Sequence, residues 1–84
     1  GINMVGDIIE FENIKYLVLA MIDYRDKPYL MVVDKSSKDL YKVLKCVNGI
    51  YKEEDNKHVI NRLLPEFSKE INYLIDEVMG DKDE

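Results

Sequence analysis

Residues 14–34 read IKYLVLAMIDYRDKPYLMVVD, and the chain is organised around this segment. Two runs rich in Tyr, Leu, Ile, Met and Val flank Arg25-Asp26-Lys27-Pro28, a pattern that predicts two long strands joined by a short turn. The first run is apolar on both alternating faces, with Tyr16, Val18, Ala20 and Ile22 on one and Leu17, Leu19 and Met21 on the other. A strand that hides both faces lies in mid-sheet with something packed on each side, or curls so that its faces change role.

Shorter strand patterns surround this pair. They predict further strands at residues 5–11, 40–47 and 50–53. Glu12-Asn13 predicts a tight turn, and residues 35–39 form a polar loop. The dipeptide Asn48-Gly49 predicts a two-residue hairpin turn, because such a turn needs positive φ at both positions. Five short antiparallel strands joined by tight turns are expected to curl into a small barrel or a strongly bent sheet.

From Asn56 the apolar period changes from two to 3.6. The apolar positions are Ile60, Leu63, Leu64, Phe67, Ile71, Leu74, Ile75 and Val78. Asp55 or Asn56 can cap the helix, since either side chain can accept hydrogen bonds from the N–H groups of its first turn. Gly80 is a suitable stop.

Pro65 interrupts this helical pattern. Proline lacks an N–H and its ring clashes with the preceding turn, so we expect a break near Leu64. The prediction is a short helix at 56–64 and a longer one at 65–79. The predicted fold class is α+β: a five-stranded antiparallel sheet, SH3-like or strongly bent, followed by one or two C-terminal helices.

The second half of the helical pattern has heptad spacing, which gives it a possible role in association. Its apolar face comprises Phe67, Ile71, Leu74, Ile75 and Val78. Leaving such a face in water would forfeit about 1.5–3 kcal/mol per large side chain. Two interpretations follow: the face packs on the sheet of its own chain, or it is shared with a second copy in a symmetric homodimer.

The net charge of −5 is unevenly distributed. Residues 1–34 carry three basic and six acidic side chains, residues 35–57 six and four, and residues 58–84 three and seven. The middle segment contains a candidate basic patch made of Lys35, Lys38, Tyr41, Lys42 and Lys45. It could contact nucleic acid, although the net charge disfavours binding to phosphates. The other interpretation is a solvated strand edge, where lysine discourages edge-to-edge aggregation.

Motifs for catalysis are absent from the sequence. His58 is the only histidine, and Cys46, the only cysteine, fits a small buried hydrophobe better than a reactive thiol. Neither a two-histidine motif, nor a Cys-x-x-Cys motif, nor an acidic calcium loop, nor a glycine-rich phosphate loop occurs. We therefore predict a non-enzyme, with no catalytic, cofactor-binding or metal-binding residues and no cofactor.

Eighty-four residues suit one domain. We expect the sheet at 5–53, a helical segment of the same domain at 56–79, a cloning remnant at 1–3 ahead of a natural start at Met4, and a disordered tail at 80–84. No apolar run reaches the ~18–20 residues of a membrane helix, and no secretory signal pattern is present. The expected location is the cytoplasm, without membrane contact.

Three motifs carry a resemblance: Gly6-Asp7-Ile8-Ile9-Glu10, Tyr16-Leu17-Val18-Leu19 and Leu63-Leu64-Pro65-Glu66-Phe67. Together they resemble small uncharacterised proteins of low-GC Gram-positive bacteria and their mobile elements. The first two also resemble the opening hairpin of SH3-like barrels. The likeness spans residues 5–67 and brings no functional residues with it.

These observations favour a small non-catalytic interaction or regulatory protein, encoded by a phage or mobile element. Its partner would be another protein or a second copy of itself. Two alternatives remain open at this point. One is a nucleic-acid-binding barrel that uses the basic patch. The other is an acidic inhibitor that occupies the nucleic-acid-binding surface of another protein, towards which negative charge would steer it.

Overall fold

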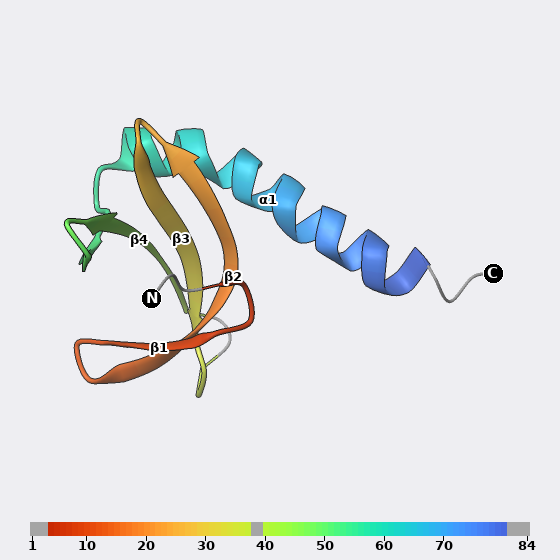
Figure 1. Cartoon of the computed structure of the whole chain (residues 1–84), viewed down its shortest axis with the longest axis horizontal. Helices are drawn as coiled ribbons and strands as arrows, with labels where there is room; N and C mark the ends of the chain where they lie inside the picture. Colours follow the sequence, from red (N-terminus) through yellow and green to blue (C-terminus); the bar gives the residue numbers. More distant parts are fainter. Residues whose placement is uncertain (1–3, 38–39, 81–84) are drawn as a thin grey trace.

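Five antiparallel strands form a curled half-barrel, and one long helix follows them (Figure 1). This arrangement, seen in a computed structural model, confirms the predicted fold class in its strongly bent form. The elements are β1 (Ile8–Phe11), β2 (Ile14–Tyr24), β3 (Lys27–Asp34), β4 (Tyr41–Val47), β5 (Ile50–Glu53) and α1 (Lys57–Gly80). Each strand pairs with the next one in the chain. The structure describes residues 4–37 and 40–80, so the prediction for 1–3 lies outside them, as does that of a tail at 80–84 except for Gly80, which belongs to α1.

Three hairpins of the described chain turn on two residues with positive φ. Their φ values are 52° and 68° at Glu12 and Asn13, 52° and 65° at Arg25 and Asp26, and 53° and 79° at Asn48 and Gly49. Two positive φ values are what a tight hairpin with right-twisted strands requires. The first and third turns confirm the sequence predictions. The second is shorter than predicted, because Lys27 and Pro28 already belong to β3.

The first strand also begins later than predicted, at Ile8 instead of residue 5. Residues before it form a turn in which the Asp7 N–H donates to the Met4 carbonyl at 3.0 Å. Gly6 within this turn has a φ of 94°, which an extended strand cannot accommodate. Regular strand pairing therefore begins only at Ile8, although Gly6 and Asp7 already exchange backbone hydrogen bonds of 2.8 and 2.9 Å with Val18.

A β-bulge in β2 changes which side chains of this strand face each of the two hydrophobic clusters. The register of β2 against β3 shifts between Val18 and Ala20, which leaves Leu19 as an extra residue. Before the shift, Tyr16 and Val18 face one cluster; after it, Ala20 faces the other. The prediction that these three residues share one face is wrong, because an extra residue reverses the alternation of side chains. Of the two alternatives predicted for this strand, the structure shows the one in which its faces change role.

The two faces have different coverings. The inner face holds a cluster to which all five strands contribute: Ile9, Tyr16, Val18, Leu30, Val32 and Leu44, with Phe11, Met21 and Tyr51 packed against it. The outer face holds Ala20, Tyr29 and Val43, which pack against Leu63 and Phe67 of α1. The curl closes the inner face on itself, whereas the outer face depends on the helix.

The helix is continuous across Pro65, so the predicted break into two helices is wrong. Pro65 is exposed, and so is Asn61, whose carbonyl loses its usual N–H partner to the proline and is left open to water. Leu63 and Phe67, on either side of the proline, are 1% and 0% exposed and anchor both turns to the sheet. Burying two such side chains recovers about 3–6 kcal/mol, which outweighs the ~3 kcal/mol cost of an internal proline.

Candidate protein-binding surface

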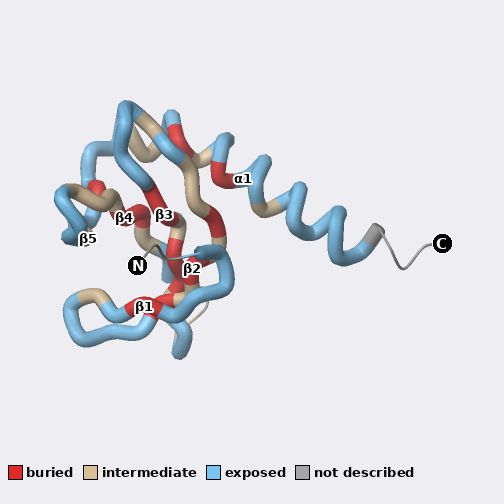
Figure 2. Tube along the Cα trace, viewed as in Figure 1, coloured by how far each residue is buried: buried red, intermediate tan, exposed pale blue. Residues whose placement is uncertain are grey.

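Beyond the sheet, α1 continues into open space with its apolar stripe uncovered. Figure 2 shows its buried positions confined to the part that lies over the sheet. Of the predicted partner face, Phe67 is fully buried on its own sheet and Ile71 is half-buried there. The other three members, together with two neighbours, are exposed by 43–65% and form what we call the overhang: Tyr73, Leu74, Ile75, Val78 and Met79. The apolar face is therefore divided between an intrachain contact and a free surface.

A second apolar surface lies on the part of the outer face that α1 leaves uncovered. Register places Leu17 opposite both Ile8 and Val33, and Val33 opposite Tyr41. Residues directly opposite one another point to the same face, so these four form a line across β1 to β4, which we call the outer row. Its two ends are open, with Ile8 46% and Tyr41 52% exposed, whereas Leu17 is half-buried and Val33 only 8% exposed in the middle of the row. Val33 shares its strand face with Tyr29, which packs against α1, so the outer row lies on the helix side of the sheet.

A hollow lies beside the outer row and another beside the overhang. One, of about 500 Å³, is lined by Ile8, Leu17, Leu19, Val33, Asp34 and Lys35. The other, of about 160 Å³, lies between the overhang and the sheet and is lined by Val5, Leu19, Ala20, Met21, Glu70, Tyr73, Leu74 and Glu77. Leu19, the extra residue of the bulge, lines both. The bulge therefore connects the outer row to the overhang in one apolar surface.

Charges flank this surface unequally. Near the overhang, Glu70, Asp76 and Glu77 are exposed, whereas Lys69 is within 3.4 Å of Glu66. Beside the outer row, Lys15 and Lys35 are joined by a 3.0 Å hydrogen bond between the Lys35 N–H and the Lys15 carbonyl. Glu10 pairs with Lys15 across the strands. Hydrogen bonds from the backbone N–H and the hydroxyl of Ser36 lower the pKa of the Asp34 carboxyl.

The candidate basic patch is divided between the two faces of the sheet. Lys42 and Tyr41 are consecutive in β4 and so point to opposite faces. Lys42 contacts Glu53 at 3.0 Å, and Lys45 lies 3.7 Å from the buried carboxylate of Glu54. Lys38 lies outside the described residues. Lys42 and Lys45 are thus paired with acidic side chains. This pairing leaves fewer free lysines to contact phosphates and weakens the support for a phosphate-binding surface.

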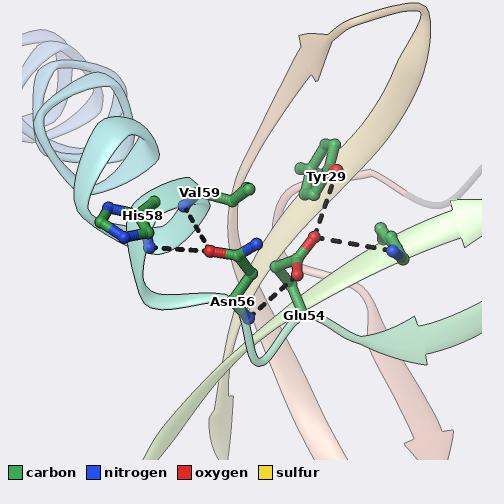
Figure 3. A network of polar contacts seen from close by, with 6 residues as sticks. Tyr29, Glu54, Asn56, His58 and Val59 are labelled. Atoms are coloured by element: carbon green, nitrogen blue, oxygen red, sulfur yellow. Dashed lines mark hydrogen bonds and ion pairs between the residues drawn. The ribbon is translucent and has the colours of Figure 1, made fainter.

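Glu54 belongs to the acidic run Glu53-Glu54-Asp55, for which the sequence alone favours a solvated turn; that prediction is wrong for Glu54, which is buried. It is 6% exposed, and Figure 3 shows its carboxylate between the sheet and the start of α1. The Tyr29 hydroxyl donates to it at 3.3 Å and the Asn56 N–H at 3.1 Å. Burial, and next the Glu54 carboxylate, raises the pKa of the Tyr29 hydroxyl, which keeps this donor protonated. With its partners satisfied, Glu54 fastens the β5–α1 connection instead of forming a reactive site.

The same connection contains the predicted helix cap. The Asn56 side-chain oxygen accepts from the N–H of His58 at 2.9 Å and of Val59 at 3.4 Å (Figure 3). Of the two predicted caps, Asn56 is therefore the one used. Glu54 and Asn56 together fix the direction in which α1 leaves the sheet, and so the position of the overhang.

Replacing Glu54 by alanine should lower the free energy of unfolding by about 1–3 kcal/mol, because the buried Tyr29 hydroxyl and the Asn56 N–H would lose their acceptor. Urea denaturation followed by circular dichroism would measure the change. The matched control is Glu53→Ala, which removes a neighbouring carboxylate from an exposed ion pair and should cost ~1 kcal/mol or less. Equal effects of the two variants would contradict the anchoring role.

The two candidate reactive side chains lie apart. His58 is exposed in the first turn of α1, and Cys46 is half-buried in β4, less enclosed than predicted, opposite Tyr51. Among the described residues, no group of three or more His, Cys, Asp or Glu side chains could hold a metal ion. Within residues 4–37 and 40–80, no helix has the length and apolar character needed to cross a membrane.

Comparisons with protein-family models, with curated proteins and with solved structures find no match to this chain.

The sequence indicated the overhang but not the outer row. The signal for the overhang was the heptad spacing, which placed Leu74 and Val78 on one helix face. The outer row could have been found only from the strand register. The two-residue turn after β2 would by itself place Leu17 opposite Asp34, whereas the bulge places it opposite Val33. An apolar line across four strands was therefore not visible in the sequence.

Proposed function

We propose that this protein is a small, non-catalytic interaction protein that acts by binding a protein chain through its outer face. The observation that supports the proposal is the continuous apolar surface made of the overhang and the outer row. Half-exposed large apolar side chains are common singly, but a contiguous apolar patch with a polar rim is typical of protein-binding surfaces. A bound protein would bury the overhang and the outer row, as the sheet already buries Leu63 and Phe67 of α1.

Affinity capture from the source cell tests this proposal. Tagged wild-type protein should retain a protein at near-stoichiometric amount, identified by mass spectrometry. Ile8→Glu in the outer row and Val78→Glu in the overhang should each reduce its recovery at least about tenfold, as a charge in an apolar interface costs several kcal/mol. Ile50→Glu is the control, because Ile50 is 62% exposed and belongs to neither surface.

Two results would contradict the proposal. One is recovery of the same protein with all three variants, which would place the binding surface elsewhere. The other is capture of nucleic acid, released by moderate salt, in place of protein. That result would favour the alternative that uses the basic residues, because phosphate contacts weaken steeply as salt rises.

A further inference from the structure

We propose that the partner is a second copy of the chain, in a symmetric dimer in which the overhang of each copy lies on the outer row of the other. This inference rests on the proposed function and identifies the protein that binds the surface. It differs from a dimer in which two helices pair along their stripes, because here a helix of one copy meets the sheet of the other.

The intrachain packing of α1 provides the template for this contact. Leu63 and Phe67 already pack on the outer face, against Ala20, Tyr29 and Val43. Leu74 and Val78 continue the same helical stripe, and the outer row continues the same sheet face. The overhang therefore continues the apolar helix stripe that packs on the sheet within one chain. The outer row continues the apolar sheet face on which that stripe packs.

Most of the overhang cannot reach the outer row of its own chain; only Tyr73 and Leu74 approach the sheet, across the hollow that they line with Leu19. Helix α1 is continuous to Gly80 and carries the overhang away from the sheet (Figure 1). Bringing residues 73–79 back over Leu17 would require breaking the helix. Contact between the two surfaces therefore needs two molecules.

The overhang fits within the length of the outer row. From Tyr73 to Met79 a helix rises about 9 Å, at 1.5 Å per residue. The outer row crosses from β1 to β4, three strand spacings, which is about 14 Å. Figure 1 shows α1 running across β3 and β2, so a helix placed across the strands repeats an orientation that the chain already uses.

Charge also favours this pairing over helix–helix pairing. Glu70, Asp76 and Glu77 flank the overhang, whereas Lys15 and Lys35 flank the outer row. Two overhangs laid together would bring four carboxylates, those of Glu70 and Glu77 in each copy, towards one another, whereas Asp76 lies on the other side of the helix from Val78. An overhang on an outer row brings carboxylates towards Lys15 and Lys35, although Glu10 and Asp34 also lie beside this row. A two-fold axis then gives two identical contacts and closes the assembly at the dimer.

Light scattering coupled to size-exclusion chromatography tests the dimer with the full chain at high micromolar concentration. Wild type and Ile50→Glu should be dimers. Val78→Glu in the overhang, and separately Ile8→Glu or Tyr41→Asp in the outer row, should raise the dimer dissociation constant at least about 100-fold. Circular dichroism should show a native spectrum for each variant, since all the substituted side chains are about half-exposed or more.

Mixing the variants distinguishes the proposed arrangement from helix–helix pairing. A copy with Val78→Glu and a copy with Ile8→Glu can still form one intact contact, between the unchanged overhang of the second and the unchanged outer row of the first. The mixture should therefore recover dimer that neither variant forms alone. A fully dimeric Ile8→Glu variant, or a mixture that stays monomeric, would overturn the arrangement.

A monomeric wild type would overturn this inference without touching the proposed function. In that case the capture experiment would still show a different protein lost with Ile8→Glu and Val78→Glu. Conversely, the wild type could form the dimer while the affinity capture retains no other protein. That result would mean that the surface serves self-association alone. The two proposals therefore fail on different measurements.

Discussion

Replacing Val18 by aspartate should unfold the protein. Val18 is 1% exposed in the inner cluster, between Tyr16 and the bulge of β2. A carboxylate there would have neither water nor a cationic partner, and burying an unpaired charge costs several kcal/mol or more. A domain of this size has a total stability of about 5–15 kcal/mol. We therefore expect loss of the β-sheet circular dichroism spectrum and of any cooperative thermal transition at neutral pH.

The matched control for this substitution is Ile50→Asp. Ile50 is also an apolar strand residue, but it is 62% exposed. A carboxylate at this position stays hydrated, and its expected effect on the free energy of unfolding is within ~1 kcal/mol. A Val18→Asp variant that melts near the wild-type temperature would show that β2 does not occupy the centre of the inner cluster.

Replacing Phe67 by alanine should lower the free energy of unfolding by about 3–5 kcal/mol. The Phe67 ring is 0% exposed and joins α1 to the outer face of the sheet. Its removal leaves a cavity between two elements that have few other buried contacts with each other. Urea denaturation at low protein concentration measures the effect, and helical and sheet signals should be lost together because Phe67 and Leu63 are the two fully buried contacts of α1 with the sheet.

Val78→Ala provides the comparison along the same helix stripe. Val78 is 56% exposed, so its truncation should change monomer stability by no more than about 0.5 kcal/mol. The contrast with Phe67→Ala tests directly whether the stripe is divided between the sheet and a free surface. Similar losses for both variants would mean that residues 72–80 pack on their own sheet in solution.

Much of the local structure could be predicted because it depends on neighbouring residues. Asn48-Gly49 and Glu12-Asn13 form turns because asparagine and glycine tolerate positive φ, although Glu12 also adopts it. Asn56 caps α1 because its short side chain reaches the N–H groups two and three residues ahead. The alternation within β3 and the 3.6 period after Asn56 gave the fold class for the same reason.

The candidate surface was only half predictable. Heptad spacing selected five residues for one helix face, and the structure keeps them on one face. It could not tell that Phe67 is fully buried on the sheet while Leu74, two turns further along the helix, is 43% exposed. The difference depends on where the sheet ends beneath the helix, which is set by strands some forty residues away in the sequence.

Pro65 and Leu19 show why the remainder required the tertiary structure. The local cost of proline predicts a break, but burial of Leu63 and Phe67 on the sheet exceeds that cost and keeps α1 straight enough to project the overhang. Alternation in β2 predicts one continuous face, but packing the two clusters requires an extra residue at Leu19. Local propensities are worth a few kcal/mol at most, so contacts between distant segments override them wherever burial is larger.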